Sequence, residues 1–251
     1  MKTRILYTVV AVLVIALGYC GWRYYDDVIR PEKQIAEADS SQNELFSEIR
    51  PTVTTGSGKT SDDATVMTES DPLAPAEEIN ESTTAWLTIP GTHIDYPVVQ
   101  GEDNDFYLHH GFDGELNQEL GCPFLDCRCE SSFRGFNSIV YAHHMTKQRM
   151  FADIALFKDE AFMRSCPEGY LTLADGVKTI RFFAYLTVPS SAAVYQVVSA
   201  EEERDEYIEY ILNTANYHFD IEIDENSRLI LLSTCTYEYD QARGVLVGVI
   251  E

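Results

Sequence analysis

Short apolar runs bounded by turn residues recur along the C-terminal two thirds of the chain and predict β-strands. Pro90, Gly91 and Gly101 bound the first two runs, as turn residues bound strands in general. The runs are 86–89, 94–99, 122–127, 138–142, 170–173, 178–188, 228–234 and 244–250. Many short strands of this kind indicate a mostly β domain, either a barrel or a sandwich.

Two helical patterns interrupt the strands. The first is 147–157, where Met150, Phe151, Ile154 and Phe157 follow the helical period of 3.6 residues. The second is 199–215, which opens with Ser199 and Glu202 in the arrangement of a capping box. An apolar stripe on this second helix is expected to pack on the core; it consists of Tyr207, Ile208, Ile211 and Leu212. The fold class is therefore mostly β with helical insertions.

The N-terminus carries an uncharged apolar stretch, ILYTVVAVLVIALGYCGW, at residues 5–22. Its length just suffices to cross a bilayer. Lys2 and Arg4 precede it, so the positive-inside rule places the N-terminus in the cytoplasm. We expect residues 1–23 to be a cytoplasmic tip and a single transmembrane anchor, with the rest of the chain outside the cell. A cleaved signal peptide is the alternative, although Tyr19 and Trp22 make a poor cleavage site.

The region after the anchor contains a helical pattern followed by a polar segment. Residues 24–50 have a helical pattern that Pro31 is expected to break or restart. Residues 51–80 are rich in Thr, Ser, Gly, Asp and Pro and predict a flexible spacer. We therefore expect a stalk and linker at 24–83, and a folded catalytic domain at 84–251.

The charge balance narrows the classes of partner. The chain of 251 residues has 41 acidic and 18 basic side chains, a formal net charge of −23. Nucleic-acid binding is not expected, because it needs clustered Lys and Arg. A basic amphipathic helix lying on an anionic membrane is excluded for the same reason.

The cysteine count suggests a working thiol. Five cysteines lie outside the anchor, and an odd number in an exported chain leaves at least one thiol over. Cys235 ends the apolar run RLILLSTC, where a thiol at a strand mouth is placed to react; a buried structural cysteine is the alternative.

Two further residues complete a set for acyl transfer. Arg243 follows a connection short enough for a hairpin, so Cys235 and Arg243 are expected at the same sheet edge; a surface pair with Asp240 is the alternative. His143 ends the run NSIVYA, although a lone histidine is more often structural. A thiol nucleophile needs an imidazole as proton partner, and a guanidinium can stabilise a developing oxyanion.

Three segments together resemble the class B sortases, namely WLTIPGTHIDYPVVQGEDNDFYLHHGFDG, IVYAHHM and LLSTCTYEYDQAR. The resemblance covers about residues 84–251. It implies a sortase-like eight-stranded β-barrel with an N-terminal helix and a long helix between strands 6 and 7. It also implies a membrane-anchored cysteine transpeptidase of a Gram-positive bacterium, which cleaves a sorting signal after Thr through a thioacyl enzyme.

The resemblance carries roles onto single residues. Cys235 matches the nucleophile of the family's TLxTC-type signature, His143 the acid and base, and Arg243 the arginine of the next strand. The residues expected to bind substrate are Asn104, Leu108, Ser233 and Thr234; for Asn104 and Leu108 a helix turn with an Asn cap is the alternative. Ala142 departs from the family's usual Gly before the histidine, a small change that we expect to be tolerated.

The resemblance also sets expectations about partners. Surface proteins bearing NPxTx-like or xPxTG-like sorting signals would be substrates, and a peptidoglycan precursor or a pilin would supply the acceptor amine. No cofactor is expected. No metal is expected either, because Cys122, Cys127 and Cys129 lack a fourth zinc ligand. Two alternatives remain: an exported cysteine peptidase that hydrolyses the acyl-enzyme, and an inactive binding domain.

Overall fold

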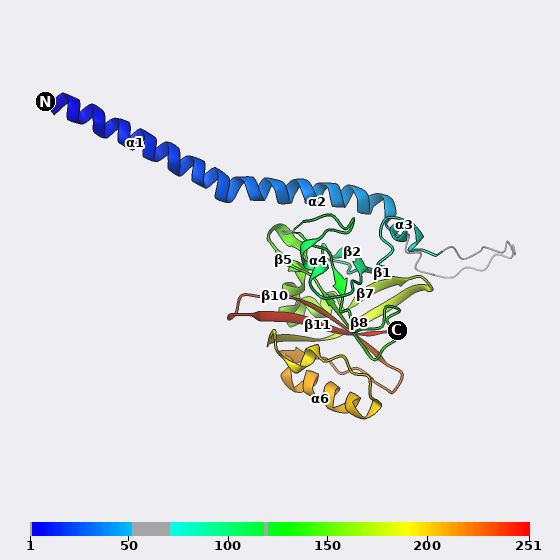
Figure 1. Cartoon of the computed structure of the whole chain (residues 1–251). Helices are drawn as coiled ribbons and strands as arrows, with labels where there is room; N and C mark the ends of the chain where they lie inside the picture. The colour runs from blue at the N-terminus through cyan, green and yellow to red at the C-terminus, as the bar shows by residue number, and fades with distance from the viewer. Residues whose placement is uncertain (1, 52–70, 118–119) are drawn as a thin grey trace. The chain divides into compact units, whose positions relative to one another are not determined.

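Eight strands close into a β-barrel in the computed structural model of the chain, which describes residues 2–51, 71–117 and 120–251 (Figure 1). The barrel strands are β1 (Thr83–Thr88), β2 (Asp95–Val99), β3 (Phe124–Leu125), β4 (Asn137–Tyr141), β7 (Glu168–Leu173), β8 (Gly176–Pro189), β10 (Arg228–Cys235) and β11 (Ala242–Ile250). Every predicted strand is present. The third is much shorter than expected, because the chain turns at Cys127–Cys129.

The order of the strands in the sheet is β11-β10-β4-β3-β2-β1-β7-β8, and pairing of β11 with β8 closes the barrel. β9 (Tyr217–His218) adds to the outer edge of β8. Most neighbours are antiparallel, but two pairs run parallel, β2 with β3 and β4 with β10. A parallel pair places the ends of both strands at the same edge, and the candidate site lies there.

The core fills the barrel interior. β10 and β11 contain continuous apolar runs, because both faces of these strands are covered. Residues 229–232 of β10 and 245–247 of β11 have no exposed surface. Trp86 of β1 is 1% exposed, and its indole Nε1 donates a 2.7 Å hydrogen bond to Asp95 Oδ1 on β2. This bond satisfies the only polar atom of a large core side chain.

The segment 147–157 corrects one prediction. It forms two 3₁₀ helices, η2 (Thr146–Gln148) and η3 (Ala152–Lys158), around the short strand β6 (Arg149–Met150), which pairs with β5 (His144–Met145). Lys147, Gln148 and Met150 have positive φ angles, which a continuous α-helix does not allow. The apolar stripe was predicted correctly, since Met150, Phe151, Ile154 and Phe157 are all buried.

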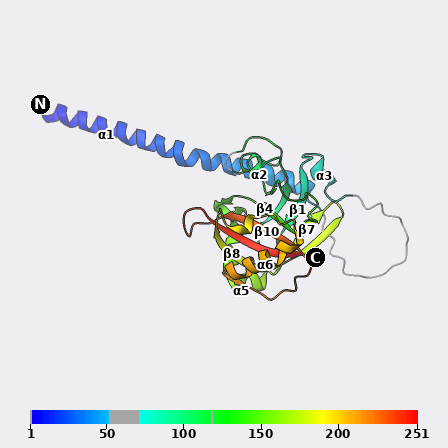
Figure 2. The same ribbon diagram turned by 60° about the horizontal axis from the view of Figure 1, so that its bottom comes forward.

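The second predicted helix forms between the sixth and seventh barrel strands, as the resemblance implied. It consists of η5 (Glu201–Glu203) and α6 (Arg204–Thr214), packs beside β8 and lies outside the barrel, as does α5 (Glu160–Ser165) (Figures 1 and 2). Tyr207 and Ile211 are buried against the barrel. The expected capping box does not form: Ala200 precedes η5, and neither η5 nor α6 has a side-chain cap.

The chain divides into two compact parts, Met1–Leu45 and Phe46–Glu251. The first is helical: α1 (Lys2–Tyr24) continues through a π-turn (Tyr25–Ile29) into α2 (Arg30–Ile49). Pro31 therefore does not end the helix, but the α-helical pattern restarts directly before it, at Arg30, which is the second of the two expected outcomes. The Arg30 amide reaches back to the Tyr25 carbonyl, and this wider turn just before Pro31 relieves the clash of its ring with the preceding turn.

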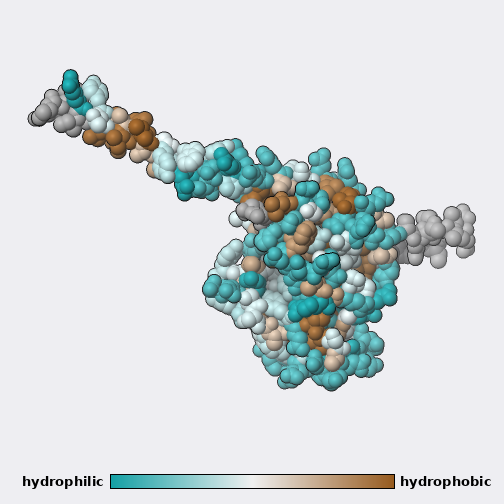
Figure 3. All heavy atoms as spheres, in the orientation of Figure 1, coloured by the Kyte–Doolittle hydropathy of each residue, from teal (hydrophilic) through white to brown (hydrophobic). Residues whose placement is uncertain are grey.

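The N-terminal helix is long and apolar enough to cross a membrane. An 18-residue window in it has a mean hydropathy of 1.6 and no buried residues. Figure 3 shows the apolar side chains of this helix as a band near its N-terminal end.

Residues on both sides of the expected spacer pack in the second compact part. Phe46 is 2% exposed and stacks edge-on against Trp86 and Phe112. A short helix, α3 (Ala74–Glu77), follows Leu73, which is 1% exposed. Of the predicted spacer, residues 52–70 lie outside the described part of the chain.

Candidate active site

Cys235 and Arg243 form the last rung of the β10–β11 hairpin. The antiparallel register pairs them directly across the two strands, as the short connection predicted. The hairpin closes just beyond them, where the Thr236 amide donates to the Ala242 carbonyl at 3.0 Å. Residues that face each other across such a pair have Cβ atoms about 5 Å apart, so the two side chains start from neighbouring positions. The Arg243 guanidinium donates through Nη1 to the Ala242 carbonyl at 3.1 Å.

His143 reaches the same edge from β4. The parallel register pairs Tyr141 with Ser233, so two residues further along both strands His143 is level with Cys235. Two bonds keep the strand ends together beyond the ladder. The Ala142 amide donates to the Ser233 carbonyl at 3.2 Å, and the Thr234 hydroxyl donates to the Ala142 carbonyl at 2.9 Å.

The backbone carbonyl of Leu108 orients the imidazole of His143. Its oxygen lies 2.8 Å from Nε2 of His143. A carbonyl can only accept, so Nε2 carries the proton in the neutral ring and Nδ1 is free to exchange a proton with a thiol. Gly121 lies against this contact: a Cβ there would lie 3.0 Å from the Leu108 oxygen and 3.1 Å from Cδ2 of His143.

One cavity of about 500 Å³ gathers all seven residues proposed from the sequence. Its lining consists of Asn104, Leu108, Phe124, Arg128, Tyr141, Ala142, His143, Ser190, Tyr195, Ser233, Thr234, Cys235 and Arg243. Cys235, His143 and Arg243 are each half-buried, so they are within reach of a ligand and yet partly screened from water. A thiol, an imidazole and a guanidinium around one hollow can carry out acyl transfer.

The four residues expected to bind substrate line the cavity, but most of their polar atoms already have protein partners. Asn104 Oδ1 accepts a 2.8 Å hydrogen bond from the Cys127 amide. The hydroxyls of Ser233 and Tyr195 lie 2.9 Å apart, and the Thr234 hydroxyl donates to the Ala142 carbonyl, just after β4. Leu108 contributes its side chain to the lining and its carbonyl to His143.

The sequence reading missed Phe124, Arg128, Tyr141, Ser190 and Tyr195 in this lining. One signal could have found Tyr141: it lies two residues before His143 at the end of a strand, and such residues share a face. Arg128 and Ser190 come from turns and Tyr195 from the 3₁₀ helix η4 (Ala193–Tyr195). Only the tertiary fold brings these segments to the site, so no local pattern marks them.

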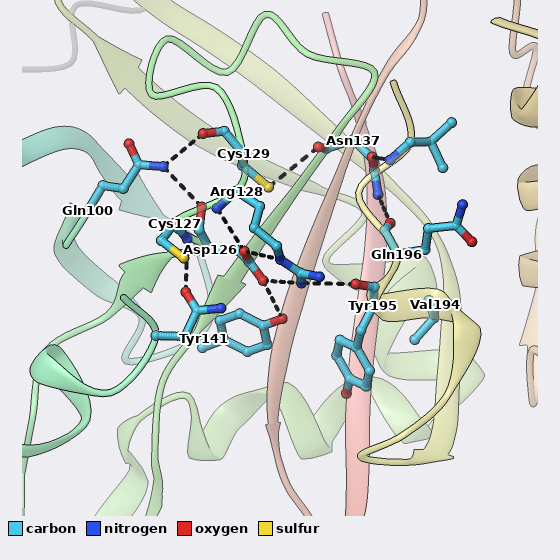
Figure 4. A network of polar contacts seen from close by, with 12 residues as sticks. Gln100, Asp126, Cys127, Arg128, Cys129, Asn137, Tyr141, Val194, Tyr195 and Gln196 are labelled. Carbon is cyan, nitrogen blue, oxygen red and sulfur yellow. Dashed lines mark hydrogen bonds and ion pairs between the residues drawn. The ribbon is translucent and has the colours of Figure 1, made fainter. Parts of the chain in front are cut away.

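The buried carboxylate of Asp126 holds two of these additional lining residues, Arg128 and Tyr141, in place. Asp126 is 0% exposed and accepts hydrogen bonds from Arg128 Nε at 2.8 Å, Arg128 Nη2 at 2.6 Å and the Tyr141 hydroxyl at 3.0 Å (Figure 4). Burial raises its pKa, but the bonds from Arg128 and Tyr141 outweigh burial, and the pKa is lowered. Asp126 therefore stays ionised beside its arginine.

Arg128 extends this network to the wall that carries Tyr195. Its Nη2 also donates to the Tyr195 carbonyl at 3.1 Å (Figure 4). Asn137 supports the same segment, because its Nδ2 donates to the Gln196 carbonyl at 2.8 Å. Burial raises the pKa of Tyr195 to about 12, so its phenol stays neutral and available for hydrogen bonding.

Three of the other thiols of the domain lie in unreactive, buried surroundings. Burial raises the pKa of Cys122, Cys129 and Cys166, that of Cys129 to about 11, so these thiols are protonated at neutral pH. Cys127 is half-exposed, and it lies with Cys129 in a turn, not on the strand we expected. Across the described ranges, no three His, Cys, Asp or Glu side chains group as a metal site would require.

Comparison with known proteins gives consistent results. No protein-family model matches the chain. Sortase B of Listeria monocytogenes is 30% identical over 178 residues, which are 70% of this chain and 72% of that protein. The crystal structure of Clostridium perfringens sortase B superposes with a TM-score of 0.67 at 31% identity, covering 71% of this chain and 98% of that one.

A third relative has the same architecture. Spy0129 of Streptococcus pyogenes, a class B sortase involved in pilus biogenesis, has a TM-score of 0.64 at 30% identity. The match covers 71% of this chain and 97% of that one. Together with the closed eight-stranded barrel and its helix between the sixth and seventh strands, these likenesses show that the chain belongs to the class B sortases, a family of cysteine transpeptidases.

Proposed function

We propose that this sortase is anchored in the cell membrane, cleaves a C-terminal sorting signal after Thr and transfers the protein to an amine. Cys235 forms the thioacyl intermediate, His143 moves the proton and Arg243 stabilises the oxyanion. The observation that supports these roles most directly is the shared cavity, lined by all three residues at the ends of β4, β10 and β11.

The first half of the reaction forms a thioester. The Cys235 thiolate attacks the Thr carbonyl carbon, and the Arg243 guanidinium donates hydrogen bonds to the resulting oxyanion. The C–N bond then breaks, and protonated His143 gives its proton to the leaving amine. This leaves a neutral imidazole and an acyl group on sulfur.

The second half returns the enzyme to its starting state. A neutral acceptor amine attacks the thioester carbon, a new C–N bond forms and the C–S bond breaks. Nδ1 of His143 takes the proton that the nitrogen loses, while Leu108 holds Nε2. Cys235 leaves as a thiolate, and the pair of charges is regenerated.

The anchor proposal rests on the N-terminal helix. Its apolar window and the preceding Lys2 and Arg4 suit a single span with a cytoplasmic N-terminus. The catalytic domain is then extracellular, where sorting signals and wall or pilus amines are both accessible.

The cavity supports a short extended peptide as substrate. Asn104 and Leu108 on one wall, and Ser233 and Thr234 on another, would contact the residues before the scissile bond. We expect an NPxTx-like or xPxTG-like signal. The role of Spy0129 in pilus biogenesis makes a pilin amine one candidate acceptor, beside a peptidoglycan precursor.

Intact-mass measurement tests the proposal. Incubation with Asn-Pro-x-Thr-x peptides should add an acyl group to Cys235, and triglycine should release it as a peptide conjugate. Cys235→Ala should give no adduct and no turnover while keeping the fold. Turnover by Cys235→Ala would refute the nucleophile. Release by water alone, unchanged by triglycine, would identify a peptidase instead.

A further inference from the structure

An exposed apolar surface lies outside the cavity, on the segment 106–116. This surface, the aromatic patch, consists of Phe106, His110 and Leu116. Phe106 is 42% exposed and Leu116 is 65% exposed. Single exposed apolar residues are common on any protein, whereas a contiguous exposed group marks a surface that binds something.

The backbone holds the three side chains of the patch on one face. The helical turn α4 (Phe106–His109) places Phe106 one turn before His110, and their rings stack with centroids 3.9 Å apart and an interplanar angle of 1°. The chain then turns back, and His110 forms an antiparallel bridge with Leu116. Side chains that oppose each other across such a pair lie on the same face, so Leu116 extends the stacked rings.

The start of α4 fixes the direction of Phe106. Asp103 Oδ1 accepts hydrogen bonds from the Phe106 amide at 2.8 Å and from the Asp105 amide at 2.9 Å. These two bonds lower the pKa of Asp103, so its carboxylate stays ionised and keeps accepting them at neutral pH. His110 is held as well, since its Nδ1 lies 2.8 Å from the Phe106 carbonyl oxygen. A patch that is ordered before its partner arrives costs less entropy on binding.

The segment that carries the patch is strongly acidic. Residues 101–117 contain five acidic side chains and no Lys or Arg. All five carboxylates are exposed; they belong to Glu102, Asp103, Asp105, Asp113 and Glu115. An exposed aromatic ring among carboxylates attracts a chain that carries both apolar and cationic side chains. The same charges repel an anionic partner, including the surface of an anionic bilayer.

The patch continues one wall of the cavity to the outside. Asn104 and Leu108 line the cavity, and Phe106 lies between them in the chain. Residues two apart on a helical turn point about 200° away from each other, so Leu108 can face the cavity while Phe106 faces outward. A peptide whose signal residues contact Asn104 and Leu108 therefore leaves the cavity over α4, and the residues before the signal reach the patch.

We infer that the aromatic patch binds the part of the substrate protein that precedes its sorting signal, and that it selects a segment with aromatic or apolar side chains beside Lys or Arg. The inference rests on the proposed function, because it assumes that a sorting signal occupies the cavity. It adds a second point of recognition, outside the signal itself.

The position of the patch determines which kinetic constant it affects. Its three side chains lie outside the cavity lining and do not contact the reacting atoms. They bind the substrate equally well before and during the reaction, and such binding lowers KM without changing kcat.

The test compares peptides that share one Asn-Pro-x-Thr-x signal and differ in the six residues before it, with the full chain in neutral detergent. One peptide carries Gly and Ser in these positions, the second Gly-Lys-Trp-Lys-Gly-Ser and the third Gly-Glu-Trp-Glu-Gly-Ser. We expect the Lys-Trp peptide to have a KM about fivefold lower than the Gly-Ser peptide, at the same kcat. The Glu-Trp peptide should lose this advantage, because the carboxylates around the patch repel it.

Two variants and a matched control locate the effect. Phe106→Ser and Leu116→Ser should each raise the KM of the Lys-Trp peptide about two- to threefold and leave kcat/KM of the Gly-Ser peptide unchanged. Leu116 lies outside α4, so Leu116→Ser tests the patch without touching the turn that holds the Leu108 carbonyl. The control is Val177→Ser: Val177 is also 42% exposed, but it lies at the start of β8, whereas Val188 near the other end of β8 pairs with Arg243.

The outcomes separate this inference from the proposed function. If the wild type cleaves none of the peptides, the proposed function fails and the inference fails with it. If the wild type cleaves all three with the same KM, or if Leu116→Ser keeps the full preference for the Lys-Trp peptide, only the inference is refuted. Equal losses with all peptides in both variants would also refute it, because they would indicate damage to the cavity wall. A change seen only in phosphatidylglycerol vesicles, and equal for all peptides, would mean that a bilayer covers the patch, which would overturn the inference too.

Discussion

Gly121 offers a way to move the candidate acid–base group without touching it. The residue has a φ angle of +62°, in the left-handed region that favours glycine. An alanine Cβ at this position would lie 2.8 Å from the Tyr107 oxygen, 3.0 Å from the Leu108 oxygen and 3.1 Å from Cδ2 of His143. The Leu108 oxygen is the atom that holds His143, so Gly121→Ala perturbs its orientation directly.

The magnitude follows from two contributions. A left-handed conformation costs a non-glycine residue about 1–2 kcal/mol. In addition, the Tyr107 oxygen must retreat about 0.6 Å to reach an ordinary contact of 3.4 Å. We expect Gly121→Ala to lower the free energy of unfolding by about 2–3 kcal/mol. Because misplacement of catalytic groups by about 1 Å costs on the order of a hundredfold in rate, we also expect a 10- to 100-fold lower kcat/KM.

Gly114→Ala is the matched control. Gly114 has a φ angle of +76°, but no heavy atom lies within 4 Å of the position that an added Cβ would take. It therefore carries the conformational cost without the steric one. Chemical denaturation and peptide-cleavage kinetics on wild type and the two variants should show about 1 kcal/mol of destabilisation and near-normal kcat/KM for Gly114→Ala.

The comparison can contradict the reasoning in two ways. If Gly121→Ala cleaves peptide as fast as Gly114→Ala, the Leu108 carbonyl does not control the position of His143. If Gly121→Ala is inactive but also unfolded, its rate says nothing of orientation; the magnitude of about 2–3 kcal/mol would then be refuted instead.

Three further predictions concern the site and its support. Arg243→Lys keeps the positive charge but cannot present two parallel hydrogen-bond donors, so kcat/KM should fall on the order of a hundred- to a thousandfold. The rate at which a small reagent alkylates Cys235 should change much less. A parallel fall in both rates would mean that Arg243 acts on the reactivity of the thiol instead. Asp126→Asn leaves Arg128 without its buried carboxylate and should destabilise the fold by about 2–4 kcal/mol in denaturant at pH 7. Because the folded pKa of Asp126 is lowered, this wild-type advantage should be lost as the pH falls below about 4, and an advantage independent of pH would contradict the ionised state. The combined variant Cys122→Ser, Cys127→Ala and Cys129→Ala should change kcat/KM less than tenfold. If this variant loses activity and added zinc restores it, the three cysteines bind a metal.

Local patterns alone identified much of the molecule. The eight barrel strands could be predicted because each is a short apolar run between turn residues. The apolar N-terminal helix could be predicted from its length and lack of charge. The rung that joins Cys235 to Arg243 was predicted for the same reason, since a short hairpin connection brings two strand ends together whatever the rest of the fold does.

Other features depended on contacts between distant segments. The barrel closes where β11 pairs with β8, and no local preference specifies that pairing. The segment 147–157 has a helical period but forms 3₁₀ turns around β6, because the pairing of β5 with β6 requires positive φ angles there. Here tertiary pairing overrides local propensity.

Some residues of the candidate site could be predicted from the sequence, and others only from the folded structure. Cys235, His143 and Arg243 lie at strand ends, where sequence position predicts spatial position. Arg128 reaches the cavity from a turn and Tyr195 from a short 3₁₀ helix. A buried carboxylate, Asp126, fixes Arg128 through hydrogen bonds. Arg128 and Tyr195 are 67 residues apart in the chain, and a hydrogen bond over that distance produces no periodic pattern in the sequence. Only the folded structure therefore shows that both residues line the cavity.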